Sequence, residues 1–197
     1  MLADQLIRRF EYIHSKGFIH RDIKPENLLM GDGKHGSTVY VTDVGMGVET
    51  SERTTWSEDV QQGKRSLVGT IRYASINAQL GTEQSSRDDM ESLGYVLIYF
   101  LRGALPWQGL KADNQVQKDG LILEKKRSAV AKELYEDLPA EFEQYFRHVQ
   151  SLCIDEKPKY VYLRNLFRGL FRRNGYKYDN IYDWTVLKFN EELDKSN

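Results

Sequence analysis

The sequence has 197 residues and a mass of 23.0 kDa, which suits one domain and is too short for two full-sized ones. Its 28 Lys and Arg residues nearly balance 29 Asp and Glu residues, and the net charge of −1 argues against general binding to nucleic acid or to a membrane surface. The single cysteine, Cys153, excludes an internal disulfide and a cysteine-based zinc site. It favours a reducing, intracellular setting in the cytoplasm or the nucleus. The first residues lack the charged leader and apolar core of a secretory signal.

Helical periodicity begins almost at the first residue and predicts a helix that ends at Gly17. Its apolar stripe has steps of three and four residues and consists of Leu2, Leu6, Phe10 and Ile13. A polar loop over 18–27 follows. Two short apolar runs, 28–30 and 38–42, predict strands, and the glycine-rich segment 31–36 predicts that they form a hairpin.

The middle of the chain predicts a long loop and then a buried helix. Residues 43–73 are polar and aperiodic, and loops of that length are usually functional. The nine-residue apolar run Leu93–Leu101 is far shorter than the roughly 20 residues of a membrane span. We therefore expect a buried helix that begins near the acidic residues 88–91, where carboxylates favour a helix start, and ends near Arg102.

Two later segments have apolar residues at helical spacing. The first, over 140–152, has Phe142, Tyr145, Phe146 and Val149 on one face. The second has Leu163, Leu166, Phe167, Leu170 and Phe171 on its apolar face. Four arginines line the outer side of the second helix, and we interpret them as a solvated face rather than a nucleic-acid stripe: Arg164, Arg168, Arg172 and Arg173. Residues 190–197 are expected to be a frayed tail.

The polar loop contains the run His20-Arg21-Asp22-Ile23-Lys24-Pro25-Glu26-Asn27, and Asp43-Val44-Gly45 comes sixteen residues after Asn27. These motifs resemble the catalytic loop and the metal-binding D-F-G of protein kinases. Phosphoryl transfer needs an oriented hydroxyl and neutralised phosphate charge. The resemblance implies Asp22 as general base, Lys24 as the cation at the γ-phosphate of ATP, and Asn27 and Asp43 as oxygen ligands of Mg²⁺.

The segment over 67–77 places Ser75-Ile76-Asn77 where most protein kinases have A-P-E. This replacement is similar to that of the casein kinase 1 family. Further similar segments cover nearly the whole chain, from Leu2 to Phe189: 83–85, 87–97, 105–111, 162–164 and 183–184. The resemblance implies an α+β, mainly helical fold: a kinase C-terminal lobe over residues 1–189 with short β-hairpins at the catalytic cleft, followed by the tail over 190–197.

The resemblance also implies roles for individual residues. Thr70 would bridge Asp22 and Lys24, Asp89 would hold the backbone of the catalytic loop, and Leu29 would form part of the floor under adenine. ATP and Mg²⁺ are the implied cofactors.

The implied partners are protein substrates whose serines or threonines follow acidic or phosphorylated residues. The residues that match the family's anion site are Arg72, Gly109 and Lys118. Arg72 and Lys118 can also be interpreted as ordinary surface cations. Gln115 and Val116 stand where the family usually carries basic residues.

Two departures leave alternatives open. Val44 replaces the D-F-G phenylalanine, and the nineteen residues before His20 contain neither a glycine-rich loop nor a V-A-I-K lysine. We therefore expect the N-terminal lobe to be absent and the isolated chain to bind Mg-ATP very weakly. The chain is then a shortened version of an active kinase, or a lobe completed by another polypeptide. The alternatives are a non-catalytic interaction module and a fragment that folds poorly.

Overall fold

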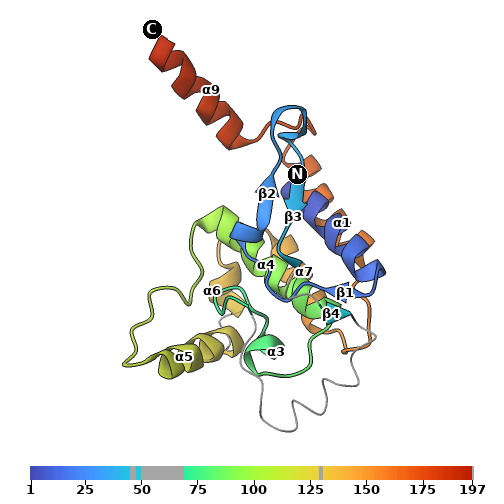
Figure 1. Cartoon of the computed structure of the whole chain (residues 1–197), viewed down its shortest axis with the longest axis vertical. Coiled ribbons are helices and arrows are strands. Elements are labelled where there is room, and N and C mark those ends of the chain that lie inside the picture. The colour runs from blue at the N-terminus through green and yellow to red at the C-terminus, as the bar shows by residue number, and fades with distance from the viewer. Residues whose placement is uncertain (45–47, 50–68, 129–130, 197) are drawn as a thin grey trace.

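The computed structural model describes residues 1–44, 48–49, 69–128 and 131–196. Its fold is mainly helical α+β (Figure 1). The helices are α1 (Leu2–Ser15), α3 (Ile76–Gln79), α4 (Ser86–Arg102), α5 (Gln115–Arg127), α6 (Ala131–Tyr135), α7 (Ala140–Gln150), α8 (Tyr160–Arg173) and α9 (Asp183–Ser196), and the 3₁₀ turns are η1 (Pro25–Asn27) and η2 (Gly33–His35). The strands are β1 (Phe18–Ile19), β2 (Leu28–Met30), β3 (Val39–Val41) and β4 (Val48–Glu49). Within the described ranges, no helix is long and apolar enough to cross a bilayer.

Helix α4 is the centre of the core. At its start the Asp88 carboxylate accepts a hydrogen bond from the Ser85 amide at 2.7 Å, and the Ser85 carbonyl accepts from the Asp88 amide at 3.0 Å. All eleven residues from Asp88 to Ile98 are buried. The last turn differs from the expectation of a fully buried apolar run, because Phe100 and Leu101 are 43% and 60% exposed.

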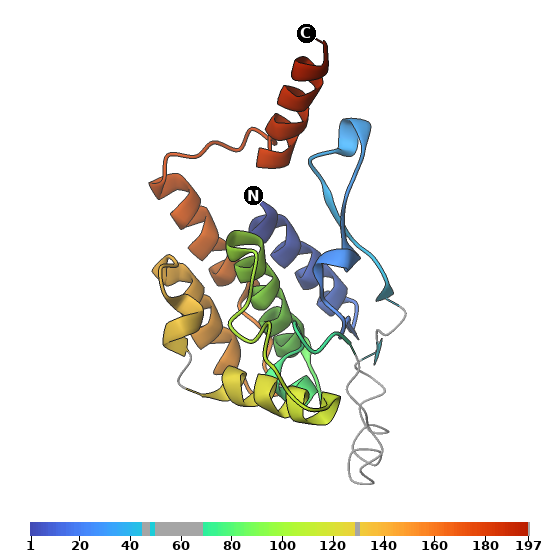
Figure 2. The same cartoon turned by 90° about the vertical axis from the view of Figure 1, so that its left-hand side faces the viewer.

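Helices α1 and α7 pack against α4, and α8 packs against α1 and α7 (Figure 2). The predicted faces of α1 and α7 are confirmed, since Leu6, Phe10, Tyr145 and Phe146 are fully buried. Aromatic rings fill much of this core, and Phe146 contacts both Tyr145 and Tyr95. Such tight packing makes the core sensitive to added volume.

Gly94 gives a direct test of this packing. A Cβ atom on Gly94 would lie 2.5 Å from Cζ of Phe146 and 2.9 Å from Cε1 of Tyr145. We expect Gly94→Ala to lower the free energy of unfolding by about 1–3 kcal/mol, because overpacking outweighs the helix propensity that alanine adds. The measurement is urea unfolding. Gly120→Ala on α5 is the control, because its Cβ meets nothing within 4 Å, and we expect it to be neutral or stabilising. Equal midpoints for the two variants would contradict the packing argument.

The predicted hairpin is confirmed as an antiparallel pair of β2 and β3, with Leu28 opposite Val41 and Met30 opposite Val39. It docks on α1, where the side-chain amide of Gln5 accepts from the Val39 amide. Strand β4 lies inside the predicted loop over 43–73 and pairs with β1, which sequence reasoning did not anticipate. Most of that predicted loop lies outside the described residues.

The C-terminal third corrects two expectations. Arg164 does not belong to a solvated face: its Nε donates to Asp4 on α1 at 2.8 Å, and both side chains are largely buried. The expected tail does not fray, because residues 190–196 continue α9, which projects away from the other helices (Figure 1).

Candidate active site

Asp89 of α4 fixes the backbone at the start of the loop over 20–27. The carboxylate of Asp89 accepts hydrogen bonds from the backbone amides of His20, at 2.7 Å, and Arg21, at 2.9 Å. The same carboxylate contacts Nε2 of His14 at 2.8 Å. The predicted role of Asp89 in holding this loop is thus confirmed. Burial opposes its ionisation, but His14 and the two amides outweigh that effect and lower the pKa of Asp89.

This backbone arrangement fixes Asp22, whose side chain is almost fully buried. One carboxylate oxygen accepts from Nζ of Lys24 at 2.6 Å, and the other accepts from the Thr70 amide at 2.9 Å. Burial alone would raise the pKa of Asp22, but the hydrogen bonds from Lys24 and Thr70 lower it below the ordinary value. Asp22 is therefore an ionised acceptor at neutral pH.

Lys24 and Thr70 approach Asp22 from opposite sides of its carboxylate. The hydrogen bond to Asp22 raises the pKa of Lys24 despite partial burial, and the charge of Asp43 acts in the same direction. Lys24 is therefore a cation at neutral pH, and it is paired with Asp22. Thr70 donates to Asp22 through its backbone amide, whereas the expected link from Thr70 to Lys24 stays a prediction.

Asn27 and Asp43 are brought together by the end of the hairpin. The amide and hydroxyl of Thr42 both donate to the Asn27 carbonyl, and Asp43 follows with a left-handed φ of 60° that turns the chain. The Asn27 side chain is buried and donates to Asp22, while Asp43 is exposed. In the part of the chain that the structure describes, no three His, Cys, Asp or Glu side chains cluster as a metal site. One carboxylate and one amide fit Mg²⁺, which takes further oxygen ligands from phosphates and water.

An open apolar face lies beside these polar groups. Leu29 is 50% exposed and lies directly opposite Tyr40 in the hairpin, so the two side chains share one face. Val44 is also exposed. This placement is compatible with the expected role of Leu29 under a flat ring, which stays a prediction.

Two of the three residues expected to bind anions lie close together. The indole Nε1 of Trp107 donates to the Arg72 carbonyl at 2.8 Å. Gly109, two residues after Trp107, turns the chain with a φ of 74°. Lys118 is exposed on α5, and the Asp119 carbonyl beside it accepts from Gln79 on α3. Arg72 and Lys118 both present cations to solvent.

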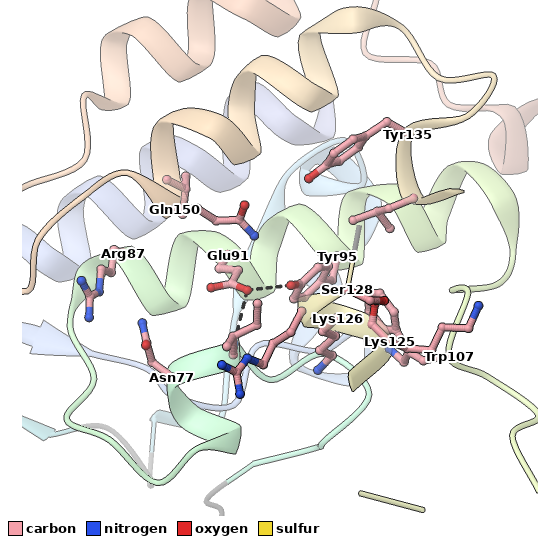
Figure 3. Close-up of a pocket in the computed structure, with 14 residues that line it drawn as sticks. Asn77, Arg87, Glu91, Tyr95, Trp107, Lys125, Lys126, Ser128, Tyr135 and Gln150 are labelled. Carbon is pink, nitrogen blue, oxygen red and sulfur yellow. Dashed lines mark hydrogen bonds between the residues drawn. The ribbon is translucent and has the colours of Figure 1, made fainter. Parts of the chain in front are cut away.

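Sequence reasoning missed a cavity of about 420 Å³ that is lined by residues of α3, α4 and the last turn of α5 (Figure 3). Its wall includes two buried charged residues, Glu91 and Lys126. Burial lowers the pKa of Lys126 to about 7, although Glu91 opposes this. Burial also raises the pKa of Glu91, which accepts a hydrogen bond from Tyr95. Because Lys126 lies in a run of three cations, 125–127, its sequence context resembles that of a surface lysine.

Comparison with known families supports the resemblance seen in the motifs. A family model for the protein kinase domain matches residues 1–160. The match spans α1, the loop over 20–27, the hairpin, Asp43, Thr70 and the helices from α3 to α7. It covers most of the chain, which therefore belongs to the protein kinase family.

Proposed function

We propose that this chain is the C-terminal lobe of a casein kinase 1-like serine/threonine kinase, with the lobe extending to residue 189. The reaction is transfer of the γ-phosphoryl group of Mg-ATP to a serine or threonine of a protein substrate. The observation that carries the proposal is the Asp22 carboxylate, ionised and fixed between Lys24 and Thr70. General bases need a defined position and a free acceptor oxygen at working pH.

The proposed step is an in-line displacement. The substrate hydroxyl oxygen bonds to the γ-phosphorus while the bond to the bridging oxygen of ADP breaks, and Asp22 accepts the hydroxyl proton. Lys24 offsets the negative charge that develops on the transferring group. Asn27 and Asp43 would hold Mg²⁺, which supplies further charge neutralisation at the phosphates. Leu29 would contact the adenine ring.

The proposed substrates are acidic or already phosphorylated, because Arg72 presents a cation two residues after Thr70, which contacts Asp22, and Lys118 presents another cation to solvent. We expect Arg72→Ala to raise KM for a phosphorylated or acidic peptide by about tenfold and to leave KM for a neutral peptide nearly unchanged, since one charge-assisted contact is lost. The measurement is steady-state phosphorylation of matched peptides by the protein expressed from its complete coding sequence. Lys34→Ala, an exposed cation on the hairpin turn, is the control. An equal rise for neutral and acidic peptides would rule out Arg72 as the anion contact.

A non-catalytic interaction module is the second candidate, and Val44 in the D-F-G position favours it. The only G-x-G-x-x-G spacing among the described residues is Gly31, Gly33 and Gly36, which lies in the hairpin turn after the 20–27 loop. A phosphate-covering loop precedes the catalytic loop in kinases, so this turn does not fill that role.

We accordingly expect the 197 residues by themselves to bind Mg-ATP very weakly, and titration calorimetry showing micromolar affinity would contradict this.

A further inference from the structure

Lys126 is a buried lysine with an unusual set of hydrogen bonds. It lies in the last turn of α5 and is 9% exposed. Its ammonium donates to two backbone carbonyls, those of Ile71 at 2.8 Å and Ala74 at 2.7 Å. The preceding residue, Lys125, points to Glu133 and is more exposed. Two adjacent lysines on one helix therefore have different surroundings.

The cavity places Lys126 between aromatic rings and a carboxylate (Figure 3). Its Nζ atom lies 5.3 Å from the ring centre of Tyr95 and 5.2 Å from that of Trp107. Glu91 lies on the same wall and accepts from the Tyr95 hydroxyl and the Ile76 amide. A buried ammonium is unfavourable by itself, and an apolar side chain of similar length could fill the same space. The side-chain nitrogen of Lys126 can donate to both carbonyls at once, which an apolar side chain cannot do.

Those carbonyls belong to the segment over 70–75, which leads from the Asp22 carboxylate to α3. The segment begins at Thr70, which donates to Asp22, and ends at Ser75, whose hydroxyl accepts from the Ala78 amide. Its carbonyls at positions 71 and 74 accept from Lys126, and the one at position 72 accepts from Trp107. The backbone is thus held from the core side, while Arg72 faces solvent.

We propose that Lys126 is a positioning residue that holds the segment over 70–75 in the shape that presents Arg72 and Thr70 to the catalytic cleft. Lys126 acts through the two carbonyls. The expected effect of Lys126 on substrate binding rests on the proposed function. Its effect on the backbone over 70–75 can be measured without any reaction.

The first test compares hydrogen exchange in Lys126→Met and Lys125→Met. Methionine keeps the unbranched stem of lysine and removes the ammonium. We expect backbone amides over 70–78 to exchange at least about tenfold faster in Lys126→Met, because the two hydrogen bonds from Nζ of Lys126 are lost. Amides in the middle of α4 and α7 should keep their rates, and Lys125→Met should match the wild type throughout. Unchanged exchange over 70–78 in Lys126→Met would overturn the proposal.

The second test separates positioning from general stability. We expect the unfolding midpoint of Lys126→Met to fall only modestly, since relief of the unfavourable burial of an ammonium offsets part of the lost hydrogen bonds. If Lys126→Met and Lys126→Gln both fail to fold, the residue supports the whole core and the proposal is wrong. Trp107→Phe, which removes the donor to the Arg72 carbonyl and keeps an aromatic ring, should loosen the same segment by a few fold. Unchanged hydrogen exchange in Trp107→Phe would also contradict the idea that Lys126 and Trp107 together position the segment over 70–75.

The third test measures how Lys126 affects the binding and phosphorylation of a peptide substrate. In the protein expressed from its complete coding sequence, Lys126→Met should raise KM for an acidic peptide by about tenfold and change kcat by less than about threefold. A loss confined to kcat would overturn the assignment of Lys126 to substrate presentation. A wild-type protein without phosphoryl transfer would instead contradict the proposed function, and hydrogen exchange would still decide whether Lys126 holds the segment.

Discussion

Asp22→Asn is expected to lower kcat for phosphoryl transfer by about 10²–10⁴-fold, the range for losing a positioned general base. Asparagine keeps the shape of the side chain but removes the charge that attracts Lys24 and the oxygen that accepts the substrate proton. KM for ATP should change little, because Asp22 contacts the hydroxyl rather than the nucleotide in the proposed step. The measurement is transfer of labelled phosphate from Mg-ATP to casein, using protein expressed from its complete coding sequence.

The matched control is Asp32→Asn, an exposed acid on the hairpin turn, which should retain wild-type activity. Hydrogen exchange of the 20–27 loop should accompany the assay, because Asp22 also accepts from the Thr70 amide. A folded Asp22→Asn variant with the same activity as the wild type would exclude catalysis through Asp22. No activity in the wild-type protein would favour the interaction module.

Asp89→Ala is expected to produce the largest loss of stability, about 3–5 kcal/mol in the free energy of unfolding. The substitution leaves the amides of His20 and Arg21 without their carboxylate, and it removes the partner of His14 Nε2. Because Asp89 is 2% exposed, water cannot replace these contacts without opening the loop. Urea unfolding measures the loss, and phosphoryl transfer should fall with it because Asp22 follows directly on this backbone.

The lowered pKa of Asp89 also predicts a dependence on pH. Its carboxylate contributes stability fully above the pKa of an aspartate in the unfolded chain, about 3.9, and the contribution is lost as pH falls through the lower folded pKa. Asp89→Ala should therefore lose less stability on acidification than the wild type. Asp194→Ala, an exposed acid on α9, should match the wild type in both measurements. A loss below about 1 kcal/mol in Asp89→Ala would show that Asp89 does not hold the loop.

The sequence by itself determined the local features, which depend on residues that are close together in the chain. The stripe of Leu6 and Phe10 specified α1, because residues three and four apart share one face of a helix. The short runs on either side of 31–36 specified the hairpin in the same local way. The order of Asp22, Lys24, Asn27 and Asp43 resembles that of the kinase catalytic loop and D-F-G, and this resemblance predicted a phosphoryl-transfer site.

The tertiary structure decided which polar residues are buried and which partners they meet. Lys126 and Lys125 are equivalent in sequence pattern, yet only Lys126 reaches the carbonyls of residues 71 and 74, because α5 packs beside α3. Arg164 is an ion-pair partner of Asp4, a residue 160 positions earlier. Such contacts depend on helices that are distant in the chain, so periodicity cannot reveal them. The sequence thus predicted the candidate reacting groups, and the packing of distant helices decided how those groups and the surrounding charges are held.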